Sequence, residues 1–300
     1  MDDTEDNMTN LKTYLILFGG VFALSTSAIF VKIASAPSAV IAFYRLLTAG
    51  LILFPFLILP KKGREEVKTI SKKQWIQIIS AGLFLALHYV MWFESLRYTS
   101  IASSTVIVCL QPLFSLALER FIQKINIKPM AMVGCLIALV GSVIIGFGDF
   151  QISGLSLFGD VLAFLAAGVI ALYFFIGQNV RKEVSAVAYS TLSYFSSAVV
   201  LLLYILVRGE PLTGFDRTTW LAFFGLALVS SIGGQFIFNL LLKKLPASAV
   251  TMSILGEPIG TCILAYIFLH EVIGLQQLLG IIFIIGGLSI YFFLPNLKKK

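Results

Sequence analysis

The chain has 300 residues, of which 58% are hydrophobic and only 12% are charged, and its mean hydropathy is +0.95. Too few polar residues are present to cover a soluble domain of this size, so we expect lipid to be the solvent for most of the chain. The net charge of +7 does not indicate a nucleic-acid partner, because the basic residues are spread among predicted loops. Cys109, Cys135 and Cys262 lie singly inside apolar runs, which indicates neither disulfides nor a metal site.

Ten apolar segments are each about as long as the roughly 17–25 residues of helix that cross a bilayer. In chain order they are residues 12–33, 39–59, 74–96, 102–122, 129–147, 156–178, 187–207, 218–242, 247–269 and 275–294. They are continuously apolar and lack the two-residue alternation of barrel strands. The predicted fold is therefore an all-α integral membrane protein with ten transmembrane helices, an acidic tail at residues 1–11 and a basic tail at 296–300.

The basic residues are distributed unequally between the two predicted membrane faces. Seventeen of the 22 Lys and Arg residues fall on the face that holds both termini, and Arg45 lies inside the second span. The opposite face has only four, which are Lys32, Arg97, Arg208 and Arg217. By the positive-inside rule, both termini are predicted to be cytoplasmic.

An internal repeat relates the two halves of the chain. The sequence YTSIASSTVIVCLQP at 98–112 aligns with KLPASAVTMSILGEP at 244–258, and the same spacing of 146 residues carries Gly134 onto Gly280 and Gly141 onto Gly287. Residues 1–150 and 151–300 then contain five predicted spans each. Because five is odd, the second half is expected to be inverted in the membrane, with a site near the midplane between the halves, as in many secondary transporters.

Several short motifs, in this order and at this spacing, resemble the EamA-type branch of the drug/metabolite transporter superfamily over essentially the whole chain. They are FVKIA at 30–34, FYRLL at 43–47, SLRYTSIASS at 95–104, LQP at 110–112, GEP at 256–258, LHE at 269–271 and GIIFIIGG at 280–287. The resemblance implies ten helices, a central substrate cavity, alternating access and, in bacteria, frequent export of amino acids or other metabolites. One departure is Ile125, which stands where the second half has Glu271 and disfavours a symmetric pair of acids.

Glu257 is the first candidate for a pathway residue. An ionisable group inside the membrane costs about 2.5–3.5 kcal/mol, so it usually faces a cavity or a partner. Glu257 lies in the middle of the ninth span on one helical stripe with Ser253 and Thr261. We expect it to bind a substrate amine or to titrate during transport. The alternative is structural, because Pro258 frees a backbone carbonyl one turn earlier and Gly256 with Gly260 allows a close helix contact, which Glu257 would only fasten.

Amide side chains in two other spans are further candidates. Gln111 is the repeat partner of Glu257 and shares a stripe with Ser104, and Gln235 precedes Asn239 by four residues. An amide can orient a zwitterion without the cost of a buried charge. The alternative is hydrogen bonding between helices.

Aromatic and basic residues complete the candidate set. His88 and Trp92 are one turn apart in the third span, and Tyr173 lies in the middle of the sixth. Together they would stack against a flat or cationic substrate, although Trp92 is also placed to be an interfacial anchor. Arg45 and Lys32 are candidate charge partners, for a substrate carboxylate or for Glu94, and a structural role is the alternative.

These features predict a secondary transporter, either an exporter or an exchanger, of small organic metabolites such as amino acids or related amines. The expected mechanism is alternating access in a bacterial inner membrane, with proton or counter-substrate coupling, and no cofactor, metal or catalytic residue is expected. A channel or sensor is one alternative. A membrane-embedded enzyme is disfavoured, because HEVIG at 270–274 lacks the second histidine of a zinc motif and no G-x-S-x-G is present. The sequence leaves open the substrate and whether the protein is a monomer or a homodimer.

Overall fold

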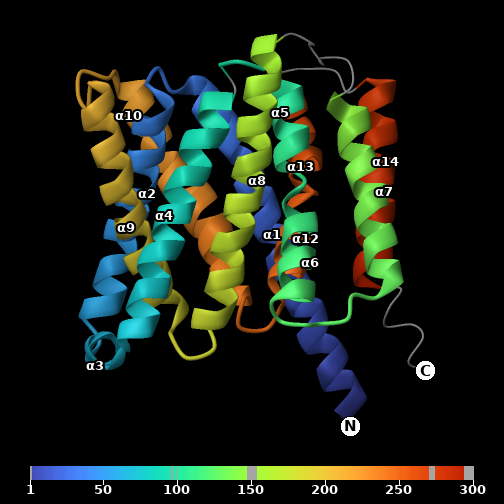
Figure 1. The fold of residues 1–300 in the computed structure, drawn as a ribbon, viewed down its shortest axis with the longest axis horizontal. Helices are drawn as coiled ribbons and strands as arrows, with labels where there is room; N and C mark the ends of the chain where they lie inside the picture. Colours follow the sequence, from blue (N-terminus) through green and yellow to red (C-terminus); the bar gives the residue numbers. More distant parts are fainter. Residues whose placement is uncertain (1, 96, 100, 147–153, 270–273, 294–300) are drawn as a thin grey trace.

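The computed structural model describes residues 2–95, 97–99, 101–146, 154–269 and 274–293. All regular elements in these ranges are helices, which confirms the predicted all-helical class (Figure 1). The first half contains α1 (Asp2–Ile33), α2 (Ser38–Ile58), α3 (Lys61–Thr69), α4 (Lys72–Ser95), α5 (Ile101–Val108), α6 (Gln111–Phe121) and α7 (Pro129–Gly146). The second half contains α8 (Gly154–Val180), α9 (Ala186–Arg208), α10 (Arg217–Gly225), η2 (Leu226–Phe236), α11 (Ile237–Leu241), α12 (Ala247–Ile254), α13 (Glu257–Leu269) and α14 (Leu275–Phe292).

Within the described ranges, eight helical stretches are long and apolar enough to cross a membrane. They are Lys12–Ile33, Ser38–Ile58, Lys72–Ser95, Leu155–Val180, Ala186–Arg208, Arg217–Leu241, Ala247–Leu264 and Leu275–Phe292, and a shorter apolar helix covers Pro129–Ile145. The predicted span at 102–122 is divided between α5 and α6, each too short to cross alone. Glu271 and the basic tail at 296–300 lie outside the described residues.

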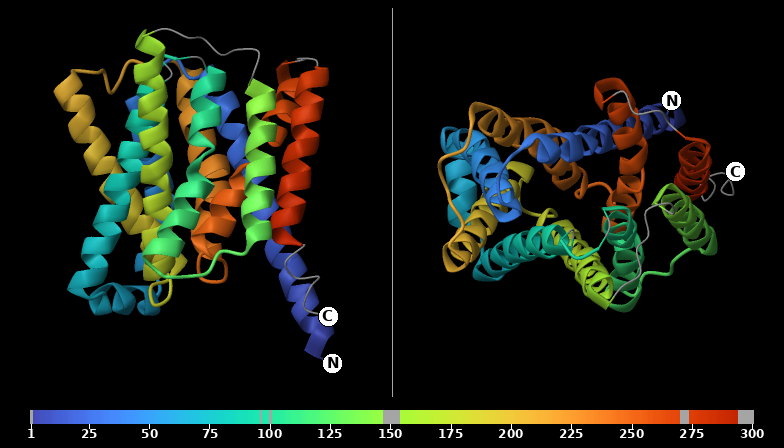
Figure 2. Two further views of the ribbon diagram at one scale, coloured as in Figure 1. Left: turned by 45° about the vertical axis from the view of Figure 1, so that its right-hand side comes forward. Right: turned by 90° about the horizontal axis from the view of Figure 1, so that it is seen from above.

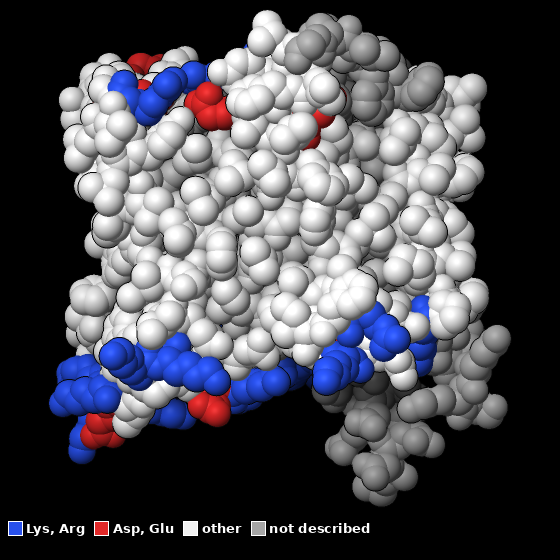
Figure 3. Space-filling model, in the orientation of Figure 1, with Lys and Arg blue, Asp and Glu red and all other residues white. Residues whose placement is uncertain are grey.

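The outer surface has the character expected of a membrane protein. Many large apolar side chains are exposed around the bundle, among them Leu15, Phe56, Leu203 and Leu279. Lys and Arg gather along the lower edge in Figure 3, whereas the middle of the visible face carries no charged side chain. We call the lower edge, which carries α3 and the start of α1, the basic face. The apolar zone between the two charged edges is where lipid tails would lie.

Two spans are interrupted at equivalent points. α5 ends at Val108 and α6 begins at Gln111, while α12 ends at Ile254 and α13 begins at Glu257. All four helix boundaries are related by a spacing of 146 residues. The cause is proline, because Pro112 and Pro258 have no N–H to bond the carbonyl one turn earlier. The chain tightens there, with three-residue hydrogen bonds such as that from the Gly256 N–H to the Ser253 carbonyl, 2.9 Å.

The helices α7 and α14 form a close pair at one side of the bundle (Figure 2). Glycines allow the backbones to meet, since a Cβ added to Gly134 would lie 2.7 Å from the carbonyl oxygen of Gly287. A Cβ added to Gly141 would lie 2.6 Å from the carbonyl oxygen of Gly280. When each glycine is replaced by its repeat partner 146 residues away, the first contact becomes the second. The two repeats therefore contribute the same pattern of glycines to this interface.

The segment η2 is a π-helix in the middle of the eighth predicted span. It packs against α1 and α2, and its glycines lie close to α1, where a Cβ on Gly234 would be 3.2 Å from the Gly20 carbonyl oxygen. π-helical turns are rare and frequently occur at functional sites. In this protein the segment directs Ser230 and Ser231 toward α1 and α2.

Candidate functional site

Arg45 of α2 is the most unusual residue of the interior, because it is only 2% exposed inside a span. Its Nε donates to the hydroxyl of Ser231, 2.8 Å away on η2, and its Nη1 lies 3.4 Å from the Ser27 hydroxyl on α1. The guanidinium carbon stands 5.1 Å from the centroid of the Tyr89 ring on α4. Nη2 has no hydrogen-bond partner among the described residues. A permanent charge is thus held by neutral groups, with one donor unused.

Glu257 is the acidic group that acts on Arg45, since the two charges interact electrostatically. The described structure shows no direct hydrogen bond or ion pair between them. Glu257 opens α13, is half-buried, and also interacts electrostatically with Tyr89 and with Cys109 at the α5–α6 break. The hydroxyl of Ser25 holds the backbone at this point by donating to the Glu257 carbonyl, 3.0 Å. The carboxyl group is therefore placed near the helix breaks, facing the cation without touching it.

The repeat partner Gln111 is buried and opens α6, just as Glu257 opens α13. The structure brings these two predicted residues to equivalent helix ends. Ser104 and Ser253 are buried as well, but their hydroxyls already have partners, Ser95 at 2.6 Å and the Val250 carbonyl at 2.7 Å. Thr261 is half-buried one turn along α13.

His88 and Trp92 of α4 form an aromatic wall beside Arg45. Their rings stack with centroids 5.7 Å apart, and Tyr89 meets His88 edge-on at 5.3 Å. The Nδ1 of His88 is 3.1 Å from the Ala166 carbonyl of α8. The indole Nε1 of Trp92 is buried and lacks a hydrogen-bond partner within the described part of the chain. The wall therefore has one unused donor, as Arg45 does.

Tyr173, Gln235 and Asn239 are deeply buried in the second half. The Asn239 amide donates to the Tyr173 hydroxyl at 2.7 Å and to the Ser190 hydroxyl at 3.0 Å, which ties α11 to α8 and α9. These two bonds favour the interhelical alternative for Asn239. Within the described residues, Gln235 Nε2 and Asn239 Oδ1 are buried without a hydrogen-bond partner.

Glu94 and Lys32 lie apart from this centre. Glu94, at the end of α4, pairs with Arg97 at 3.5 Å and accepts a hydrogen bond from the Tyr204 hydroxyl at 3.3 Å. Lys32, at the end of α1, is exposed. The pairing of Arg45 with Glu94 considered from the sequence is not what the structure shows.

Three residues of the Arg45 site were not among the sequence candidates. Ser27, Ser231 and Tyr89 supply its contacts, but small hydroxyls and a tyrosine in an apolar helix carry no distinctive sequence signal. Only their positions around one arginine, fixed by three different helices, reveal the role.

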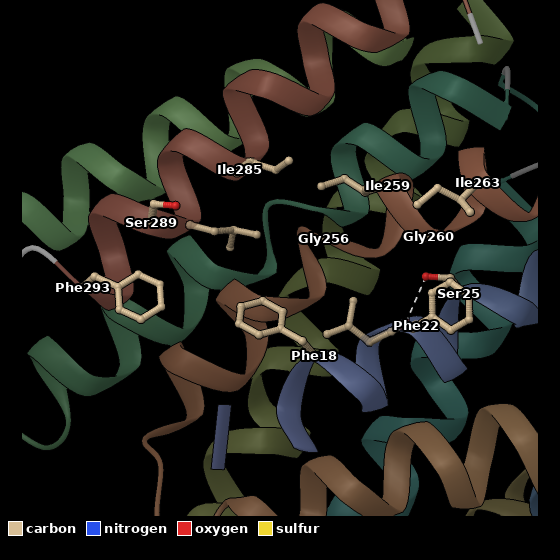
Figure 4. Close-up of a pocket in the computed structure, with 12 residues that line it drawn as sticks. Phe18, Phe22, Ser25, Gly256, Ile259, Gly260, Ile263, Ile285, Ser289 and Phe293 are labelled. Carbon is tan, nitrogen blue, oxygen red and sulfur yellow. Dashed lines mark hydrogen bonds between the residues drawn. The ribbon is translucent and has the colours of Figure 1, made fainter. Parts of the chain in front are cut away.

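An apolar pocket of about 290 Å³ lies between α1, α13 and α14. Figure 4 shows Phe18, Phe22 and Ile285 around it. Gly256 and Gly260 also line the pocket and place no side chain in it. The hydroxyl of Ser25 lies 3.0 Å from the Val21 carbonyl of its own helix and equally far from the Glu257 carbonyl, so it shares its one hydrogen between them. No predicted site residue lines this pocket, so the polar centre around Arg45 is a separate feature.

Comparison with known proteins gives consistent matches. The model of the EamA-like transporter family matches twice, at residues 11–147 and 157–293. Similar curated proteins include the uncharacterized transporter YyaM of Bacillus subtilis, 26% identical over 93% of each chain, and YdfC of the same organism, 23% identical over 87% of this chain and 83% of YdfC. The uncharacterized inner membrane transporter YedA of Escherichia coli is 26% identical over 70% of this chain and 71% of its own.

A solved crystal structure has the same fold, with a TM-score of 0.80 and 17% identity, over 95% of this chain and 98% of the other.

Proposed function

Because this chain belongs to the EamA-like transporter family, we propose that it is a secondary transporter that carries a small organic metabolite by alternating access. Membership in a transporter family also agrees with the expectation that the chain is not an enzyme. The inner membrane is the proposed location, since one similar protein is named as an inner membrane transporter. The basic face is then cytoplasmic by the positive-inside rule.

The proposed topology is ten transmembrane helices in two inverted repeats, residues 1–150 and 151–300. Three observations support it. The two family matches begin and end 146 residues apart. The breaks in α5–α6 and α12–α13 have the same spacing. The same shift also turns one glycine contact of the α7–α14 pair into the other. In such transporters the two halves move against each other around a central site built on broken helices.

The proposed substrate is a zwitterion, which means an amino acid or a closely related amine that retains an anionic group. The observation that carries this proposal is Arg45, a buried cation with neutral partners and an unused Nη2 donor. An arginine inside a membrane cannot lose its charge, so it requires an anion to offset its cost. A substrate carboxylate would fill this role, while Glu257 receives the ammonium group.

The neighbouring groups fit the same ligand. Gln111 would orient the backbone of the substrate from the start of α6, and the wall of His88 and Trp92 would contact its side chain. A single acid at the site is compatible with exchange and with proton coupling. Glu257 would release an amine in the first case and a proton in the second.

The test uses purified protein in liposomes and three labelled compounds that share one side chain: an amino acid, its decarboxylated amine and its deaminated acid. Wild type is expected to carry only the amino acid. The variants Glu257→Gln and Arg45→Gln should reduce its transport at least tenfold, and Gln111→Ala should impair it less, whereas Trp75→Phe should transport normally. The loss follows because a buried charge left without its partner costs several times the energy of a tenfold change.

Three outcomes would contradict the proposal. Absence of uptake for a broad panel of zwitterions would reject the substrate class, and channel-like currents would reject the transporter mechanism. Normal transport by Glu257→Gln and Gln111→Ala would show that the pathway lies elsewhere.

A further inference from the structure

The two junctions between the repeats are packed differently. At the basic face α6 packs against α12, each contributing the half of a broken span that lies on that side (Figure 1). The repeat makes α5 and α13 the equivalent pair at the opposite face. Within the described residues, these two helices contact each other far less. The two sequence repeats are thus related, but the α6–α12 pair packs closely and the equivalent α5–α13 pair does not.

The junction at the basic face is fastened by polar contacts to the start of α12. This helix follows Pro246, whose side chain has no acceptor for the free N–H groups of the first turn. Other helices provide the acceptors. The Ser248 N–H donates to Glu119 Oε1 of α6 at 2.8 Å, and the Ala247 N–H donates to Gln178 Oε1 of α8 at 3.1 Å.

These contacts are shielded from water. Glu119 is 4% exposed and Ser248 is 2% exposed, although both lie near the end of a helix. The Tyr291 hydroxyl of α14 donates to the Ser248 hydroxyl at 3.1 Å, so four helices meet at one point. A hydrogen bond from a backbone N–H to a buried carboxylate is about twice as strong as a neutral one. We call Glu119, Ser248 and Tyr291 the inner cluster.

At the opposite face, the three positions equivalent to the inner cluster carry apolar side chains. Applying the 146-residue spacing places Ala265 at the position of Glu119, Ala102 at that of Ser248 and Ile145 at that of Tyr291. None of these side chains can accept or donate a hydrogen bond. This particular set of contacts is therefore not repeated at the opposite face, although the equivalent helices occur there.

We infer that the inner cluster is a gate that closes the pathway toward the basic face, with Glu119 as its positioning residue. This inference rests on the proposed alternating access. The gate acts directly on the site, because α6 begins at Gln111 and α12 ends just before Glu257. Opening toward the basic face requires α6 to leave α12 and the Ser248 N–H to lose its acceptor. The gate therefore biases the transporter toward one side.

The test compares Glu119→Ala with Glu119→Gln, because glutamine keeps the carbonyl acceptor and alanine removes it. The reporter is Ser253→Cys on the buried side of α12, with Cys109, Cys135 and Cys262 replaced by Ala. A membrane-impermeant thiol reagent is applied to right-side-out and to inverted vesicles. In the parent, the introduced thiol should react mainly from the opposite face. Glu119→Ala should increase labelling from the basic face about tenfold, consistent with loss of one charged hydrogen bond, and Glu119→Gln, which keeps a weaker neutral bond, should increase it clearly less.

Hydrogen exchange on the chain with its natural cysteines gives a second measurement. The amides at the start of α12 should exchange about tenfold faster in Glu119→Ala, consistent with the same lost hydrogen bond, with Tyr291→Phe intermediate and the exchange of α2 and α9 unchanged. Equal labelling and exchange in Glu119→Ala and Glu119→Gln would overturn the gate. Loss of protection throughout the protein would also overturn it, because the effect would then be general unfolding. Both readouts are independent of substrate, so the gate can fail while transport of a zwitterion stands, or the reverse.

Discussion

At the scale of single residues, buried arginines do two different tasks in this protein. Arg45 lies in the span interior with neutral partners and one unused donor, as expected of a residue that binds an anionic ligand. Arg181 lies in the loop between α8 and α9 and donates to the carbonyls of Asn239, Leu240 and Val184. Burial lowers the pKa of Arg181, and the nearby Glu66 opposes that shift. Two of these carbonyls, those of Asn239 and Leu240, lie near the end of α11, so Arg181 caps that helix.

Arg181→Gln is expected to lower stability by about 2–3 kcal/mol, because hydrogen bonds from a charged donor contribute roughly 1.5–3 kcal/mol. Thermal unfolding of the detergent-purified variant would measure the loss. The matched control is Lys182→Gln at the adjacent exposed position, which should unfold like wild type. Equal midpoints for the two variants would mean that Arg181 does not fasten α11.

At the scale of elements, the helix breaks and the glycine contacts decide how the spans pack. Pro112 and Pro258 divide two spans and place Gln111 and Glu257 at the first turn of a half-helix. Both prolines are visible in the sequence, but continuous spans were predicted over 102–122 and 247–269, so the breaks themselves came only from the structure. The π-helix η2 also came only from the structure, because a regular helix was predicted over 218–242 and no local residue preference marks a π turn.

Gly287→Ala is expected to destabilise the protein by about 1–3 kcal/mol, since the added Cβ would push against the Gly134 carbonyl and force the α7–α14 pair apart. Gly286→Ala is the control, because nothing lies within 4 Å of a Cβ at that position. Denaturation in detergent, followed by the loss of helical signal, would compare them. If Gly287→Ala proved as stable as Gly286→Ala, the glycine interface would have been assigned wrongly.

At the scale of the whole molecule, charge sets orientation and pseudo-symmetry sets mechanism. Lys and Arg gather on the basic face (Figure 3), and α3 lies at this edge as a short exposed helix (Figure 1). Because Lys and Arg are retained on the cytoplasmic side during insertion, this face should be internal. In the proposed mechanism the two halves alternate around the Arg45 centre, and the inner cluster makes opening toward the basic face harder.

Orientation can be tested with single added cysteines on exposed residues. Thr213→Cys, on the loop between α9 and α10, should react with an impermeant thiol reagent in intact cells. Lys62→Cys, on α3, should react only after the cells are opened. The unaltered chain is the control, since its cysteines are buried or half-buried. Labelling of Lys62→Cys in intact cells would reverse the proposed topology.

The sequence by itself determined the membrane class, the family, the approximate spans and the repeat, because apolar length, loop charge and proline position are local properties of the chain. It also picked out Arg45, Glu257, Gln111 and the His88–Trp92 pair, since polar groups are rare inside spans. Only the tertiary structure decided which of them meet. In the structure Arg45 contacts Ser231 and Tyr89 rather than Glu94, and Asn239 bonds Tyr173. Glu119, which the sequence places at the end of a span, is buried and accepts a hydrogen bond from α12. Such contacts join helices far apart in the chain, and their energy depends on distances that no local pattern records.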